Sequence, residues 1–106
     1  MSQNFAAFDQ GPVGLISTLN ITSETVVYAK PGLLVSIVVT TAGSAVGSIH
    51  DAATTGASAA GNLVAVIPET VGPIQFGGGG FPLENGLLVI PGTGQVVNVA
   101  YRTTGG

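Results

Sequence analysis

Leu33 to Thr41 reads LLVSIVVTT, directly after a Lys30-Pro31-Gly32 turn, and this stretch decides the fold. Six of its nine residues are β-branched, and the Pro-Gly turn fixes where the run begins. Strict alternation places one set of residues on one face of a strand (Leu33, Val35, Ile37, Val39) and the next set on the other (Leu34, Ser36, Val38, Thr40). We therefore predict a central β-strand that needs cover on both faces, from a second sheet on one side and from a loop or a neighbouring subunit on the other.

Glycine and proline turns divide the rest of the chain into short apolar runs, at the spacing of an antiparallel sandwich. The predicted strands cover residues 13–21, 24–29, 46–50, 62–67, 73–76 and 95–102, with a hairpin or broken strand over 81–90. We expect 46–50 to be the hairpin partner of the central strand, 51–61 to be a surface loop and 103–106 to be a frayed tail. The fold class is therefore all-β, an antiparallel β-sandwich or jelly-roll-like single domain over residues 13–106, preceded by an N-terminal arm at residues 1–12.

The apolar residues of these strands predict the core. We expect it to contain Leu34, Val35, Ile37, Val39, Ile49, Leu63, Val66, Leu88, Val97, Val99 and Tyr101. Phe5 and Phe8 lie in the arm, and we expect them to dock on this subunit or on the next one, because two exposed aromatic rings are costly.

Charge is scarce along the whole chain. Only seven of 106 residues are Asp, Glu, Lys or Arg, whereas about a quarter is usual, and 45% are hydrophobic. A surface made of Gly, Ser, Thr and Ala is easily buried, so we expect an assembly; a threonine-rich soluble monomer is the alternative. Lys30 and Arg102 are the only fixed cations, too few for a nucleic-acid patch or a polybasic membrane anchor.

Other classes are disfavoured by what the chain lacks. It has no cysteine, so a disulfide framework and a thiolate metal site are both impossible. The first ten residues have no basic segment followed by an apolar run, so we expect no secretory signal. The longest apolar run is about eight residues, well below the roughly 20 residues of a membrane helix.

His50-Asp51 is the one place where an imidazole adjoins a carboxylate, the pair that general base catalysis uses. Neighbouring strand residues point to opposite faces, which disfavours a direct dyad. The structural alternative is a histidine at the end of a strand, with Asp51 capping the turn that follows. One histidine with scattered carboxylates is also too few ligands for zinc, and we expect no metal or other cofactor.

Three further candidate sites rest on short patterns. Any two of the five acids are possible glycosidase carboxylates, but nothing in the sequence selects a pair. Asp51 with loop carbonyls is a possible calcium site without the usual acidic pattern. Gly77–Gly80 resembles a phosphate-binding loop, yet Phe81-Pro82 follows where a P-loop needs Lys and Ser or Thr, so a flexible loop or a subunit contact is the better interpretation.

The order of the strand motifs adds a resemblance. It is carried by TVVYAKPGLLVSIVVTTAGSAVGSIHDAA (25–53), LVAVIP (63–68), FPLENGLLV (81–89) and VNVAYR (97–102). This order resembles small structural proteins of tailed bacteriophage virions, namely head decoration (cement) proteins and head fibres. The residues that carry it occupy turns and core positions, such as Pro31-Gly32, Gly47, Asp51, Gly86 and Tyr101.

The resemblance implies a non-enzymatic virion protein, made in the host cytoplasm and located on the capsid surface. Its expected partners are the major capsid protein and further copies of itself, with a trimer favoured, and no nucleic acid or membrane. The expected interface residues are Phe5, Phe8, Gly77, Gly78, Gly79, Gly80 and Phe81. The alternatives are a tail or fibre subunit, a carbohydrate-binding module and, least favoured, a hydrolase.

Overall fold

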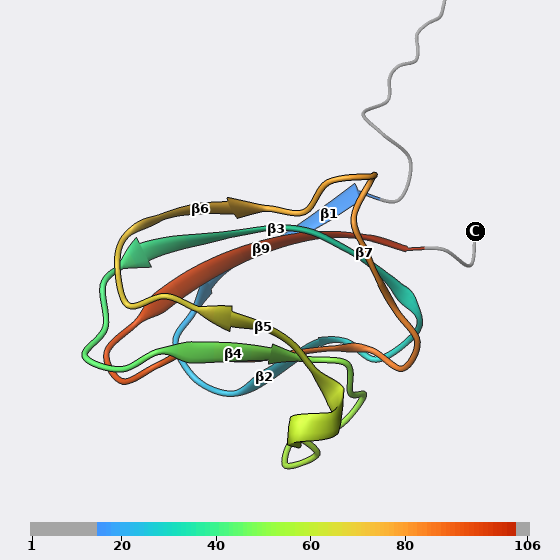
Figure 1. The fold of residues 1–106 in the computed structure, drawn as a ribbon, viewed down its shortest axis with the longest axis horizontal. Coiled ribbons are helices and arrows are strands. Elements are labelled where there is room, and N and C mark those ends of the chain that lie inside the picture. The colour runs from blue at the N-terminus through green and yellow to red at the C-terminus, as the bar shows by residue number, and fades with distance from the viewer. Residues whose placement is uncertain (1–14, 104–106) are drawn as a thin grey trace, which may run out of the picture.

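Two antiparallel sheets pack face to face in the computed structural model, which describes residues 15–103 (Figure 1). The five-stranded sheet contains, in spatial order, β1 (Leu15–Ile21), β9 (Val96–Thr103), β3 (Gly32–Thr41) and β6 (Gly72–Gln75), and β7 (Phe81–Leu83) also pairs with β3. The four-stranded sheet contains β2 (Thr25–Tyr28), β8 (Leu87–Ile90), β4 (Gly47–His50) and β5 (Leu63–Ile67). A 3-10 turn, Ala60–Asn62, precedes β5, and the described residues include no helix long and apolar enough to cross a bilayer.

The strands pair in a nested order. β1 pairs with β9, β2 with β8, β3 with β6 and β7, and β4 with β5. Because most connections also pass from one sheet to the other, the topology is that of a jelly roll. The predicted all-β sandwich is confirmed, and each observed strand lies within two residues of its prediction. The predicted arm at 1–12 lies outside the described residues.

One predicted pairing is wrong. β4 does not form a hairpin with the central strand β3; it lies in the opposite sheet between β8 and β5. The connection after β3 crosses the end of the sandwich, where the Gly43 N–H donates to the Glu69 carbonyl (3.1 Å) and the Ser44 N–H to the Thr93 carbonyl (2.9 Å). The tail prediction also changes, because Thr103 belongs to β9 and pairs with Gly32.

A β-bulge changes which residues of β3 face the core. Leu34 and Ser36 lie opposite the consecutive residues Tyr101 and Ala100, so Val35 is an extra residue without its own partner on β9. Leu34 therefore joins Ile37 and Val39 on the buried face, and Val35 is only partly buried. The alternation expected from Leu33 fails at this point, because one inserted residue turns the side chains of the preceding strand residues to the opposite face of the sheet.

Most of the predicted core is buried, with three corrections. Leu63 and Val66 are 46% and 52% exposed, because β5 is an edge strand and they lie away from the interior. Val35 is only partly buried, whereas Leu88 is fully buried as predicted, although it lies outside the central cluster that contains Leu87 and Val89. The prediction missed six buried apolar residues: Ile21, Ala52, Ile67, Leu83, Leu87 and Val89.

Gln95 is a buried polar residue that ties the β8–β9 connection to the β5–β6 connection. Its Oε1 accepts the Gly92 N–H (3.0 Å), and its Nε2 donates to the Pro68 carbonyl (2.7 Å). A Cβ at Gly47 would lie only 2.7 Å from this Oε1, so glycine is needed where β4 begins. With both ends of its amide satisfied, Gln95 fixes this end of the sandwich at no cost in unpaired polar groups.

Candidate protein-docking surface

The glycine run predicted as a contact site is a loop that joins two strands, β6 and β7, which pair with the same edge of β3. β6 pairs with residues 36–39 of β3 and β7 with residues 32–34, and between them the Phe76 N–H donates to the Val35 carbonyl (3.1 Å). Gly77–Gly80 then leaves the sheet and returns, closed by a hydrogen bond from the Gly80 N–H to the Gly77 carbonyl (3.2 Å). Gly78, Gly79 and Gly80 have φ values of 68°, 87° and 128°, which other residues rarely adopt. The loop therefore returns the chain to the same strand in four residues.

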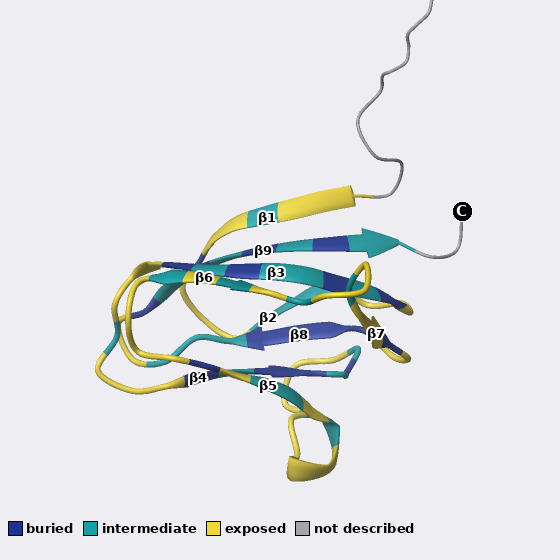
Figure 2. Ribbon diagram, turned by 45° about the horizontal axis from the view of Figure 1, so that its top comes forward, coloured by how far each residue is buried: buried dark blue, intermediate teal, exposed yellow. Residues whose placement is uncertain are grey.

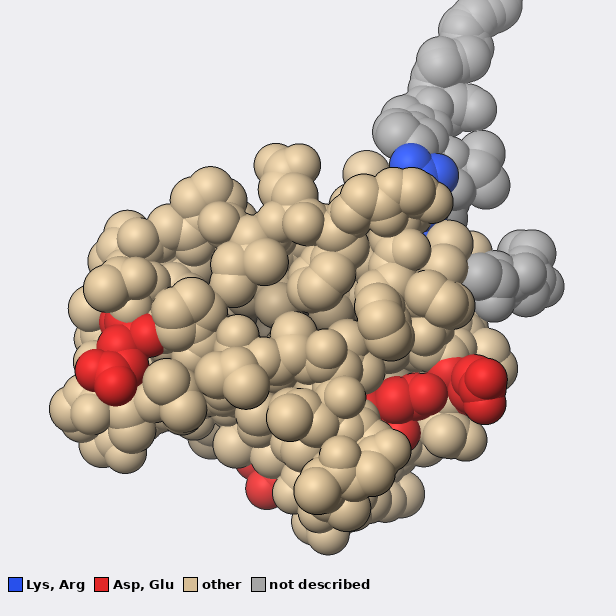
Figure 3. All heavy atoms as spheres, in the orientation of Figure 1, with Lys and Arg blue, Asp and Glu red and all other residues tan. Residues whose placement is uncertain are grey.

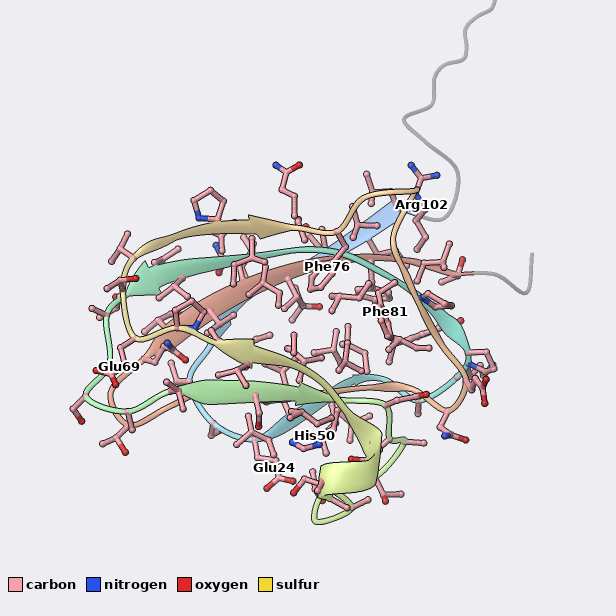
Figure 4. The ribbon with its side chains drawn as sticks, viewed as in Figure 1. Glu24, His50, Glu69, Phe76, Phe81 and Arg102 are labelled. Atoms are coloured by element: carbon pink, nitrogen blue, oxygen red, sulfur yellow. The ribbon has the colours of Figure 1, made fainter. Side chains whose placement is uncertain are left out.

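Two aromatic rings flank this loop. Phe76 and Phe81 meet edge to face, with ring centroids 6.4 Å apart and an interplanar angle of 65°. Phe76 packs against the core, whereas Phe81 remains 42% exposed. Figure 4 shows both side chains between the two sheets. Among the predicted contact residues, Phe81 thus packs against Phe76, a residue that the sequence did not lead us to select, and Gly77–Gly80 lies between the two. The predicted contact residues Phe5 and Phe8 lie outside the described residues.

The surrounding surface carries almost no charge. We call it the β5–β6 face and define it by β5, β6, the glycine loop and Phe81; it is the side that faces the viewer in Figure 1. Figure 3 shows acidic atoms at the rim of this face and none at its centre. Exposed apolar side chains on its elements are Leu63 and Val66 of β5 and Val71, which precedes β6 and is 63% exposed. Such a surface is desolvated easily by another protein.

The β5–β6 face also contains two sheet edges. β5 and β6 are the outermost strands of their sheets on this side. β6 carries Pro73, which blocks pairing with a further strand, whereas β5 reads LVAVI with neither proline nor charge. The unpaired side of β5 can accept an extended segment of a partner through main-chain hydrogen bonds.

The most enzyme-like arrangement is a row of three hydrogen-bonded side chains, Ser48 and His50 on β4 and Asn62 directly before β5. His50 is 7% exposed, with Nε2 3.0 Å from the Ser48 Oγ and Nδ1 2.8 Å from the Asn62 Oδ1. Since Oδ1 is an acceptor, Nδ1 carries a proton, and the order hydroxyl, imidazole, amide is that of a nucleophile, a base and an orienting group.

Three observations describe the surroundings of Ser48, His50 and Asn62. β4 lies between two partner strands, so the sheet occupies the N–H groups that could otherwise stabilise an oxyanion near Ser48. No pocket is present in the described part of the chain. Asn62 also binds the preceding loop, since its Oδ1 accepts the Ala59 N–H (2.9 Å) and its Nδ2 donates to the Ala57 carbonyl (2.9 Å). The row of side chains therefore fixes the 51–62 loop against the sheet.

Asp51 has a different role from the one expected. It does not cap the turn that follows it; its carboxylate accepts the N–H groups of Glu84 (3.0 Å), Asn85 (2.7 Å) and Gly86 (3.2 Å) in the distant turn between β7 and β8. Burial alone would raise the pKa of Asp51, but these three donors outweigh burial and lower the pKa below its ordinary value of 3.8.

The described acids other than Asp51 form no group that could hold a metal ion. The Glu24 Oε2 accepts the Gly56 N–H (2.7 Å) and so holds the tip of the 51–62 loop. Within residues 15–103, no three His, Asp or Glu residues are grouped as metal ligands. The possible calcium site at Asp51 therefore has no group of three such ligands among these residues, and Asp9 lies outside them.

No family model, curated protein or solved structure matches the chain. The β5–β6 face is therefore the main structural feature from which function can be inferred.

Proposed function

We propose that the protein is a non-enzymatic structural subunit of a bacteriophage virion, a decoration or cement protein that binds the lattice of the major capsid protein and stabilises the shell. The observation that supports this most is the β5–β6 face, which combines an open, uncharged edge strand with Phe81 and other exposed apolar side chains. The resemblance of the strand motifs to virion proteins supplies the partner. Capsid binding would place the subunit on the outside of the particle, as a symmetric homo-oligomer such as a trimer.

The physical basis of this role is mass action. A subunit that binds the assembled shell and not its dissociated parts stabilises the shell by its binding free energy, and many copies add up. Docking through an uncharged face avoids the cost of desolvating unpaired ions. Phe81 is the natural anchor, because an exposed aromatic ring that becomes fully buried contributes about 1.5–3 kcal/mol.

The test is binding to phage heads that lack the protein. The purified chain is expected to co-sediment saturably with the heads and to raise the temperature at which they release DNA. Phe81→Ser should weaken binding by about tenfold or more, the effect of losing roughly 1.4 kcal/mol or more. Val46→Ser is the matched control, since Val46 is also exposed, at 55%, but lies next to β4 at the Glu69 end of the sandwich.

Two results would overturn the proposal. One is the absence of binding to any head while the chain stays a single copy at high concentration. The other is a ring or shaft of this protein in images of native particles, which would assign it to the tail or to a fibre.

A further inference from the structure

The turn between β7 and β8 contains an Asn-Gly pair, Asn85-Gly86, whose members lie in different environments. Asn85 is exposed, whereas Gly86 is buried at the entrance to β8, a strand that Figure 2 shows buried over most of its length. A Cβ at Gly86 would lie 2.7 Å from the carbonyl oxygens of both Tyr28 and Ala52, so packing requires glycine at this position. The fold therefore places, directly after an exposed asparagine, the residue type that hinders its own backbone nitrogen least.

This pair has a chemistry of its own. Asparagine is one of the thermolabile residues of proteins, because its side-chain amide can react with the backbone nitrogen that follows it. Here the Gly86 nitrogen would give its proton to a solvent base and attack the Asn85 Cγ, and the amino group of the side-chain amide would take up a proton and leave as ammonia. The product is a cyclic succinimide, which water opens at either carbonyl to yield aspartate or isoaspartate at position 85.

The Asp51 carboxylate holds the backbone of the pair in a geometry that cannot close this ring. Its Oδ1 accepts the N–H groups of both Asn85 (2.7 Å) and Gly86 (3.2 Å). Two successive N–H groups converge on one oxygen only where their nitrogens lie on the same side of the intervening Cα–C bond. The tetrahedral Cα of Asn85 then turns its Cβ away from the Gly86 nitrogen, whereas ring closure needs these two atoms on the same side.

The charge of Asp51 opposes the reaction as well. Attack requires the Gly86 nitrogen to lose its proton, and the negative charge that then develops would lie beside a carboxylate. Burial alone would raise the pKa of Asp51, but the three N–H groups of the turn lower it below 3.8, so this carboxylate is charged at neutral pH. A carboxylate with a lowered pKa is also a poor base for removing the proton.

We propose that Asn85-Gly86 is a site of succinimide formation and deamidation that the Asp51 carboxylate blocks in the folded protein. The reaction proceeds when the contact between Asp51 and the turn opens. Either product then places a second negative charge beside Asp51, and isoaspartate also adds a main-chain carbon between the two N–H groups that Asp51 binds. The modification therefore releases the turn from the end of β4 permanently. This chemistry does not depend on the proposed capsid role.

The first test needs no variant. The unmodified chain is incubated folded and in guanidinium chloride at the same pH and temperature, and deamidation of peptides that contain Asn85 is followed by mass spectrometry. The folded chain should react about tenfold or more slowly, the effect of keeping a hydrogen bond worth roughly 1.4 kcal/mol or more. Equal rates in the two states, or no reaction at Asn85 in the unfolded chain, would overturn the proposal.

The second test separates the Asp51 contact from general stability. Asp51→Ser removes the carboxylate, and Val39→Ala is the matched control, because it truncates a buried side chain of β3 that lies opposite Val97 and takes no part in the turn. With both variants shown to be folded by circular dichroism, Asp51→Ser should deamidate at Asn85 about tenfold faster than the unmodified chain, and Val39→Ala should resemble the unmodified chain. Equal acceleration in the two variants would show that loosening of the fold, and not the carboxylate, controls the reaction, which contradicts the proposal.

Discussion

At the scale of single residues, Asp51 is the clearest case of a polar side chain that positions a remote segment. Its carboxylate binds three backbone N–H groups of the turn that leads from β7 into β8. Asp51→Asn removes the negative charge and leaves one amide oxygen for three donors, so we expect a loss of about 1–2 kcal/mol in the free energy of unfolding. Urea unfolding at about pH 7 measures the change.

The same contact predicts a pH dependence. Because the pKa of Asp51 is lowered in the folded protein, its contribution to stability is present above the unfolded value near 3.8 and is lost as pH falls below that value through the folded pKa. The stability difference between the unmodified chain and Asp51→Asn should therefore shrink in acid. Glu84→Gln is the control, since Glu84 takes part through its backbone N–H. A difference that stays constant down to about pH 2 would show that charge is not the cause.

His50 illustrates what the sequence alone predicts about such contacts. Its neighbour Asp51 suggested a catalytic pair, but the two side chains bind different parts of the fold, as adjacent residues of a strand usually do. The partners that matter are Ser48, two residues earlier on the same face, and Asn62, which arrives only because the 51–62 loop folds back. Strand alternation would have identified Ser48, whereas no local pattern identifies Asn62.

At the scale of elements, the 51–62 loop acts as a cover for the outer face of the four-stranded sheet. Asn62 holds it through His50, Ala57 and Ala59, and Glu24 holds its tip. The fully buried Leu88 lies opposite His50 on this side of the sheet. A segment of small residues that reads as a plain surface loop is therefore part of the packing.

Asn62→Ala should release this cover. It leaves the buried His50 Nδ1 and two backbone groups of the loop without their partner, so we expect a loss of about 2–3 kcal/mol. Limited proteolysis should cut between residues 52 and 61 faster in the variant, and urea unfolding gives the free energy. Ser58→Ala, at an exposed position of the same loop, should change neither measurement. Equal proteolysis of the two variants would contradict the role of Asn62.

The sequence predicted the strands far better than their partners. Strand limits follow from local signals, namely β-branched runs between Gly or Pro turns, and these were correct within two residues. Pairing depends on contacts between distant segments, so the placement of β4 beside β3 was wrong, and the bulge at Val35 was invisible. Phe81 and the glycine run stay a prediction as contact residues, while Phe76, which lies before the same run and meets the Phe81 ring, was a signal that the sequence offered and we missed.

At the scale of the whole molecule, scarcity of charge determines how the protein can bind. The chain has a net charge of −3 with two cations, and its acids with resolved contacts hold turns and loops within the subunit. Long-range attraction to a charged partner is therefore weak, and recognition has to come from shape, apolar contact and main-chain pairing. In the proposed role, exclusion of water from the β5–β6 face would supply most of the binding free energy.

This predicts that binding to phage heads depends little on salt. Raising NaCl from about 50 mM to about 500 mM shortens the screening length severalfold, yet the dissociation constant should change by less than about threefold, because few ion pairs are available to be screened. Co-sedimentation across a salt series measures it. Sulfate should strengthen binding, since it favours burial of apolar surface. A steep loss of affinity with NaCl would instead assign docking to Lys30 and Arg102 on an acidic partner, and the β5–β6 face would no longer account for it.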